Sequence, residues 1–146
     1  MPTGIRYVPL ETARNPDDIN RLCRGTMCEF VGIVITEIGD DYVRGTMPVD
    51  ERTRQHMGIV HGGASVVLAE TLGSVAAGLC VPVGARSVGL DINANHLRAG
   101  KPPLLTGIAR PVHVGNTTSV WEIRITDVDD KLVCVSRLTC AVLQER

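Results

Sequence analysis

The stretch Ala64-Ser-Val-Val-Leu-Ala-Glu-Thr-Leu-Gly-Ser-Val-Ala-Ala-Gly-Leu79 is the one long helical segment that this sequence predicts. Its apolar residues are spread nearly all the way round a helix, so we expect the helix to be buried on most of its sides. Pro82 and Gly84 end it. A single carboxylate, Glu70, lies inside this small and apolar run. Because a carboxylate is almost never fully buried unless it is paired or takes part in chemistry, Glu70 is a candidate functional residue.

Strand-like segments flank the helix on both sides. Two precede it, at 33–37 and 42–47, and four follow it, at 87–95, 104–114, 119–126 and 132–143. A shorter helix is predicted from Pro16 toward Arg24, with Asn15 as its cap. This order predicts one α+β domain over residues 1–146, in which an antiparallel sheet wraps around the long central helix. Residues 1–27 form an N-terminal helical lead-in.

The central helix is apolar on too many faces for a sheet of this size to cover. We therefore expect that a second copy of the chain covers part of this surface or a sheet edge.

Composition excludes several classes of function. The net charge of −1 over 146 residues leaves no basic patch for nucleic acid. No apolar run reaches the roughly 18 residues of a membrane span, and the N-terminus lacks the plan of a signal peptide, so a cytoplasmic location is expected.

The five cysteines are an odd number without a Cys-x-x-Cys pair, which argues against a disulfide framework and against a metal site. Cys134 and Cys140 are expected to be small buried residues on one strand face.

The start of the long helix is a candidate anion site. Gly62 and Gly63 precede Ala64, so no side chain is expected to cap the free amides there. Those amides, together with the helix dipole, could stabilise a developing negative charge as an oxyanion hole. A tight turn that requires positive φ is the structural alternative, and the two glycines alone would favour it.

Glu70 suits a general base or a nucleophile, with Ser74 one turn further along the same helix face. The alternative is a structural carboxylate bound to an amide, hydroxyl or arginine. Gln55 and His61 lie shortly upstream and favour catalysis. The Gly-x-Ser-x-Gly motif of serine hydrolases is absent. Attack on a thioester by water or by Glu70 itself is therefore favoured over attack by a serine.

A resemblance to a known family rests on six pieces of the sequence, which are Gln55, His61–Ser65, Glu70–Ser74, Val88–Arg98, Val112–Gly115 and Val120–Ile123. With them the chain resembles the hotdog-fold acyl-CoA thioesterases from about residue 28 to residue 143. It is most similar to the Glu-dependent branch, which includes 4-hydroxybenzoyl-CoA and phenylacetate-pathway thioesterases, dihydroxynaphthoyl-CoA hydrolase and the enterobactin proofreading thioesterase.

The resemblance implies a homodimer with a continuous sheet, assembled further into a homotetramer, and active sites at the dimer interface. Glu70, as nucleophile or general base, would act on a thioester held by the neighbouring chain's Gln55, His61 and Gly62. The Gly62 N–H would polarise the carbonyl, His61 and Gln55 would position it, and Ser74 would help to place water or the acyl group.

The resemblance also implies a path for coenzyme A, which is part of the substrate rather than a cofactor. The residues along it are Gly89, His96, Leu97, Arg98, Ala99, Lys101, His113, Val114, Gly115, Asn116, Thr117 and Thr118. Arg98 and Lys101 would bind phosphate, unless they are solvated surface charges. His96 and His113 could equally be structural. Relatives often carry a basic residue in place of Asn116, so hydroxyl and backbone bonds from Thr117 and Thr118 would replace it.

Two other functions compete with thioester hydrolysis. One is hydration or dehydration of an acyl thioester, and the other is acyl-CoA binding without catalysis. The few aromatic residues (Tyr7, Phe30, Tyr42 and Trp121) make stacking on an aromatic acyl group less favoured. Medium-chain, hydroxybenzoyl-type and acyl-carrier-protein thioesters all stay open as substrates.

Overall fold

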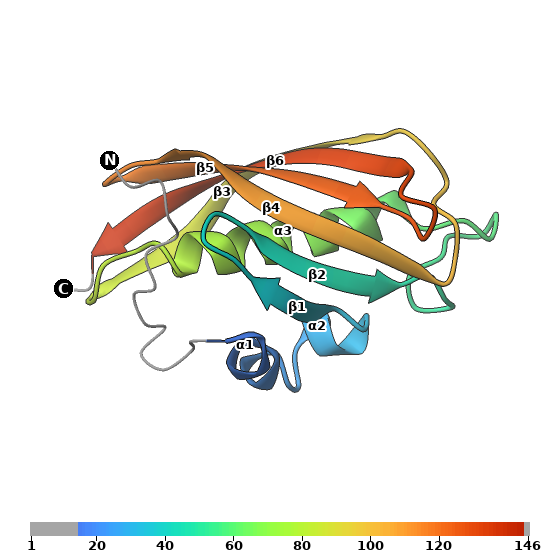
Figure 1. Ribbon diagram of the computed structural model, residues 1–146, viewed down its shortest axis with the longest axis horizontal. Coiled ribbons are helices and arrows are strands. Elements are labelled where there is room, and N and C mark those ends of the chain that lie inside the picture. Colours follow the sequence, from blue (N-terminus) through green and yellow to red (C-terminus); the bar gives the residue numbers. More distant parts are fainter. Residues whose placement is uncertain (1–14, 145–146) are drawn as a thin grey trace.

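The computed structural model describes residues 15–144 (Figure 1). Its elements are α1 (Pro16–Leu22), α2 (Met27–Phe30), β1 (Val34–Ile38), β2 (Val43–Pro48), α3 (Gly62–Gly78), β3 (Ala85–His96), β4 (Leu104–Val114), β5 (Thr118–Thr126) and β6 (Leu132–Gln144). The strands form one antiparallel sheet in the order β1-β2-β4-β5-β6-β3. The predicted sheet with one long helix is therefore confirmed. Residues 1–14 of the predicted lead-in lie outside the described part.

The helix α3 lies along the concave face of the sheet and packs against β2 to β6 (Figure 1). Leu68, Leu72 and Ala76 are fully buried on its sheet-facing side. Leu72 enters a notch formed by Gly45 and Gly107, which are register partners on β2 and β4. A Cβ atom at either glycine would lie 2.7 Å or 2.6 Å from a Leu72 methyl group, so only glycine admits the helix this closely.

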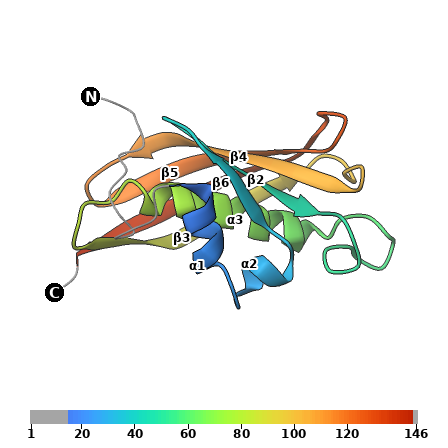
Figure 2. The same cartoon turned by 60° about the horizontal axis from the view of Figure 1, so that its bottom comes forward.

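The first two helices lie beside β1 (Figures 1 and 2). Asn15 caps α1 as predicted, since its side chain accepts the Asp18 N–H at 3.0 Å. Asn20 exchanges two hydrogen bonds of 2.8 Å with the backbone of Ile35, which fixes α1 against the sheet edge. The short helix α2 was not predicted, because four residues are too few to show a helical period.

The strand β3 is the other edge of the sheet and pairs on one side only, with β6. It is 12 residues long, and a bulge interrupts its register between Gly89 and Asp91. Leu90, at this bulge, is 63% exposed, and Val88 is exposed as well. A long edge strand with free backbone groups and exposed apolar side chains is suited to pairing with another strand.

The five cysteines are free thiols, and Cys134 and Cys140 are completely buried, as predicted. Within residues 15–144 no helix is long and apolar enough to cross a membrane.

Candidate active site

The loop between β2 and α3 is held in a defined shape by its own backbone. The Gln55 N–H donates to Ile59 O at 2.9 Å, and the Gly58 N–H donates to Gln55 O at 2.9 Å. The side-chain carbonyl of Gln55 accepts the N–H of Met57. This bond engages the oxygen of the Gln55 amide, and no acceptor among residues 15–144 bonds its NH₂ group.

The start of α3 corrects one expectation from the sequence. The helix begins at Gly62, and its N-cap is His61, whose Nδ1 accepts the Gly63 N–H at 2.8 Å. A side chain therefore does cap one amide, which the sequence reasoning missed because histidine is not among the usual N-cap residues. Among residues 15–144, no acceptor bonds the Gly62 N–H. One amide at the positive end of the helix is thus left available to a ligand.

A surface pocket of about 420 Å³ opens at this helix start. Its lining residues are Gln55, Ile59, Val60, Gly62, Ser65, His96, Leu97, Arg98, Ala99 and Val133. The imidazole of His96 lies directly over Gly62, where an added Cβ would come within 2.9 Å of Nε2. Because glycine has no Cβ, the His96 ring can lie against the backbone of Gly62. In one chain the structure brings together six of the predicted site residues: Gln55, Gly62, His96, Leu97, Arg98 and Ala99.

Glu70 lies away from this pocket. Its carboxylate faces β3, with Oε1 3.1 Å from the position that a Cβ of Gly89 would take. Burial raises the pKa of the Cys140 thiol, and the neighbouring carboxylate of Glu70 raises it further. Glu70 is half-buried, whereas Ser74, one turn later, is exposed. A carboxylate with partial solvent access next to an exposed hydroxyl can activate water or attack an electrophile.

Glu70 and the anion site face different neighbours, since the carboxylate lies by Gly89 on β3 and Gly62 lines the pocket. Glu70 follows Gly62 by eight residues in the same helix, which is about 12 Å along the axis. Reacting groups must approach to about 3–3.5 Å. The two ends of the motif therefore lie at separate places in one copy of the chain.

Apart from Gly89, which lies against Glu70, the predicted coenzyme A residues form two groups at opposite ends of the sheet. His96 pairs with Cys134 at one end, and Thr118 pairs with Ala141 at the other. The intervening strand β4 is roughly 35 Å long at 3.3 Å per residue. The group at His96–Lys101 adjoins the pocket, and the group at His113–Thr118 does not.

The two candidate phosphate ligands already have partners in the chain. Arg98 donates from Nη1 to Leu132 O at 2.9 Å, which leaves its other N–H groups available. Lys101 Nζ lies 2.8 Å from Asp129 in an exposed ion pair, and this hydrogen bond raises the pKa of Lys101. In the other group, the ring of His113 lies against Gly115, where an added Cβ would be 2.7 Å from Nε2. Within the described residues no cluster of His, Cys, Asp and Glu could hold a metal ion.

Comparisons with known proteins place the sequence and the fold of this chain among thioesterases. Residues 57–134 match the thioesterase superfamily. The chain is 48% identical over 125 residues to the 1,4-dihydroxy-2-naphthoyl-CoA hydrolase of Escherichia coli (strain K12), covering 86% of this chain and 92% of that protein. It is 46% identical over 125 residues to the proofreading thioesterase EntH of Cronobacter sakazakii, with coverage of 86% and 91%. The crystal structure of thioesterase HI1161 from Haemophilus influenzae superposes with a TM-score of 0.88 at 45% identity, covering 92% of this chain and 94% of that one.

A curved antiparallel sheet around one central helix, with this degree of similarity to solved thioesterases, defines a hotdog-fold enzyme that hydrolyses thioesters. The chain belongs to the thioesterase superfamily.

Proposed function

We propose that this enzyme hydrolyses an acyl-CoA thioester to the free acid and CoA, in an active site that two copies of the chain form together. The observation that carries the proposal is the separation of Glu70 from the free Gly62 N–H along a single helix. The substrate class is supported by the similarity to a relative named as a CoA-thioester hydrolase.

The anion side of the site lies at the start of α3. The Gly62 N–H donates to the thioester oxygen, where negative charge develops as the carbonyl carbon becomes tetrahedral. The NH₂ group of Gln55 donates to the same oxygen, since its carbonyl is held by Met57. His61 caps the helix and so keeps the first turn and its amide in place.

The attacking side lies at Glu70 of the other copy. The carboxylate either removes a proton from water, which attacks the carbonyl carbon, or attacks that carbon itself to form an anhydride that water then hydrolyses. In both routes the C–S bond breaks, CoA leaves as the thiolate and takes up a proton, and the acyl group ends as the acid. Ser74, on the same helix face, is placed to bind the water or the acyl group.

The free edge of β3 is the proposed contact between copies. Antiparallel pairing of two β3 strands about a two-fold axis brings Glu70 of one copy toward the helix start of the other. The same axis reverses the strand direction. The His96–Lys101 group of one copy then lies toward the His113–Thr118 group of its partner, so both groups can line one CoA path. The homotetramer and the cytoplasmic location stay predictions from the sequence.

The test is release of free CoA from a panel of acyl-CoA and acyl-carrier-protein thioesters, followed with a thiol-trapping reagent. Glu70→Gln keeps the shape of the side chain and should lower kcat by about tenfold or more, because it removes the base or nucleophile. The matched control is Glu122→Gln, a change at a carboxylate on β5. If the wild-type protein releases no CoA, or if the Glu70 variant stays within tenfold of it, the proposal is wrong.

A further inference from the structure

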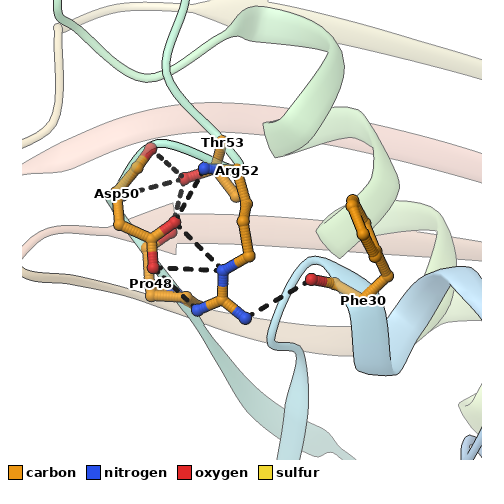
Figure 3. A network of polar contacts seen from close by, with 5 residues as sticks. All are labelled: Phe30, Pro48, Asp50, Arg52 and Thr53. Atoms are coloured by element: carbon orange, nitrogen blue, oxygen red, sulfur yellow. Dashed lines mark hydrogen bonds and ion pairs between the residues drawn. The ribbon is translucent and has the colours of Figure 1, made fainter.

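A polar network at the end of β2 joins three parts of the chain (Figure 3). Arg52 binds both carboxylate oxygens of Asp50, with Nε at 3.2 Å from each and Nη2 at 2.7 Å from Oδ2. Its Nη1 donates to Phe30 O at 3.3 Å, at the last turn of α2. Arg52 therefore links the loop after β2 to α2.

The backbone before β1 is packed closely against the same arginine. Gly32 has φ of +79°, and a Cβ there would lie 2.7 Å from Cγ of Pro48 and 3.0 Å from Nη2 of Arg52. The guanidinium group thus contacts Asp50, the Phe30 carbonyl and the Gly32 backbone, while the side chain keeps 37% of its surface exposed. These contacts hold the side chain between the loop after β2 and the end of α2.

Thr53 connects this network to the start of α3. Its side chain is 1% exposed, donates to Pro48 O at 2.7 Å and accepts the Asp50 N–H at 3.2 Å. Its carbonyl accepts the N–H of His61, the N-cap residue of α3, at 2.7 Å. Gln55 follows Thr53 by two residues. The backbone on which both proposed oxyanion donors depend is therefore anchored at Thr53.

We propose that Asp50 and Arg52 are positioning residues, which brace the loop that carries Gln55 and the helix start that carries Gly62. This inference rests on the proposed function. Neither residue lines the pocket, so they act on the reaction through Thr53, Gln55 and His61 rather than by touching the substrate.

We call the contacts of Asp50 and Arg52 with each other and with Phe30 the brace. Unlike an ordinary surface ion pair, the brace should affect the turnover rate of the enzyme. An exposed pair contributes little to folding stability. A small displacement of donors that stabilise the transition state lowers kcat strongly, since misplacement by about 1 Å can cost roughly 10²-fold. Loss of the brace should therefore lower kcat far more than it changes KM or the thermal midpoint.

The first experiment compares Arg52→Ala and Asp50→Asn with Arg110→Ala. Arg110 forms an exposed pair of 2.9 Å with Asp41 and lies outside the pocket, which makes it a matched control. Arg52→Ala should lower kcat by about tenfold with KM nearly unchanged, and Asp50→Asn should act in the same direction. The control should keep the wild-type kcat. If Arg52→Ala and Arg110→Ala have the same kcat, the brace is refuted.

A double-mutant cycle with Gln55→Ala separates positioning from a general structural defect. When Gln55 is already absent, Arg52→Ala should cost only about twofold, because one donor that the brace positions is gone. Full additivity of the two changes would mean that Arg52 acts independently of Gln55, and would overturn the proposal.

Hydrogen exchange provides a readout that does not depend on activity. In Arg52→Ala the N–H of His61, which bonds to Thr53 O, should exchange about tenfold faster, whereas amides in β4 to β6 should be unchanged. If the wild-type enzyme hydrolyses no tested thioester, the proposed function fails while this exchange still decides the brace. Unchanged protection at His61 would overturn it.

Discussion

The ring of His61 caps the helix that carries the proposed base: its Nδ1 accepts the N–H of Gly63 at 2.8 Å. The cap occupies the Gly63 amide and leaves the Gly62 amide to a ligand. The same bond thus stabilises the helix and selects which amide faces the pocket.

This relationship predicts the stability of two variants. His61→Ala should lower the free energy of unfolding by about 1 kcal/mol, because one amide at the helix start loses its partner. His61→Asn should recover most of that loss, since asparagine is among the best N-cap residues. Urea unfolding of the two variants measures the difference. A His61→Ala variant as stable as the wild type would mean that the cap contributes nothing.

The shared active site predicts complementation between two inactive variants. A heterodimer of Gln55→Ala with Glu70→Ala has one site with both residues intact and one with neither. Co-expression with two different tags and tandem purification should therefore give about half of the wild-type kcat per dimer. Each variant alone should be impaired. A heterodimer no more active than the two homodimers would show that each site belongs to one chain.

Gly89 should matter to catalysis because of the space it leaves for Glu70. A Cβ at this position would lie 3.1 Å from Oε1, so Gly89→Ala displaces the carboxylate and should lower kcat by about tenfold. Gly78→Ala is the control, since no atom lies within 4 Å of its added Cβ. Steady-state kinetics and sedimentation should be measured together. A Gly89→Ala dimer with wild-type kcat would contradict the assigned position of Glu70.

The interaction of Asp50 with Arg52 should contribute to folding stability in a way that depends on pH. The hydrogen bond from the Arg52 side chain holds the pKa of Asp50 below its usual value, and the charge of Arg54 adds to this. Because the folded pKa is the lower one, the stabilisation is complete above the unfolded value of about 4. It is lost as the pH falls through the folded value. The difference in unfolding free energy between wild type and Asp50→Asn should therefore shrink between pH 7 and pH 3, and a constant difference would contradict it.

Local patterns were sufficient to predict most of the elements. The turn signals on either side of 104–114 predicted β4 with its observed bounds, and the cap at Asn15 predicted α1. The network of Asp50, Arg52 and Thr53 was missed. Its bonds reach the carbonyl of Phe30, 22 residues away, and spacing alone does not indicate such a contact.

The sequence by itself determined most of the secondary structure, the burial of the central helix and the presence of a carboxylate on it. These features depend on neighbouring residues and on the helical and strand periods, which are properties of local sequence. Only the tertiary structure decided that Glu70 faces Gly89 on β3, that His96 covers Gly62, and that the residues predicted for CoA lie at two ends of the sheet. These contacts depend on strand order and register, which bring together residues far apart in the chain.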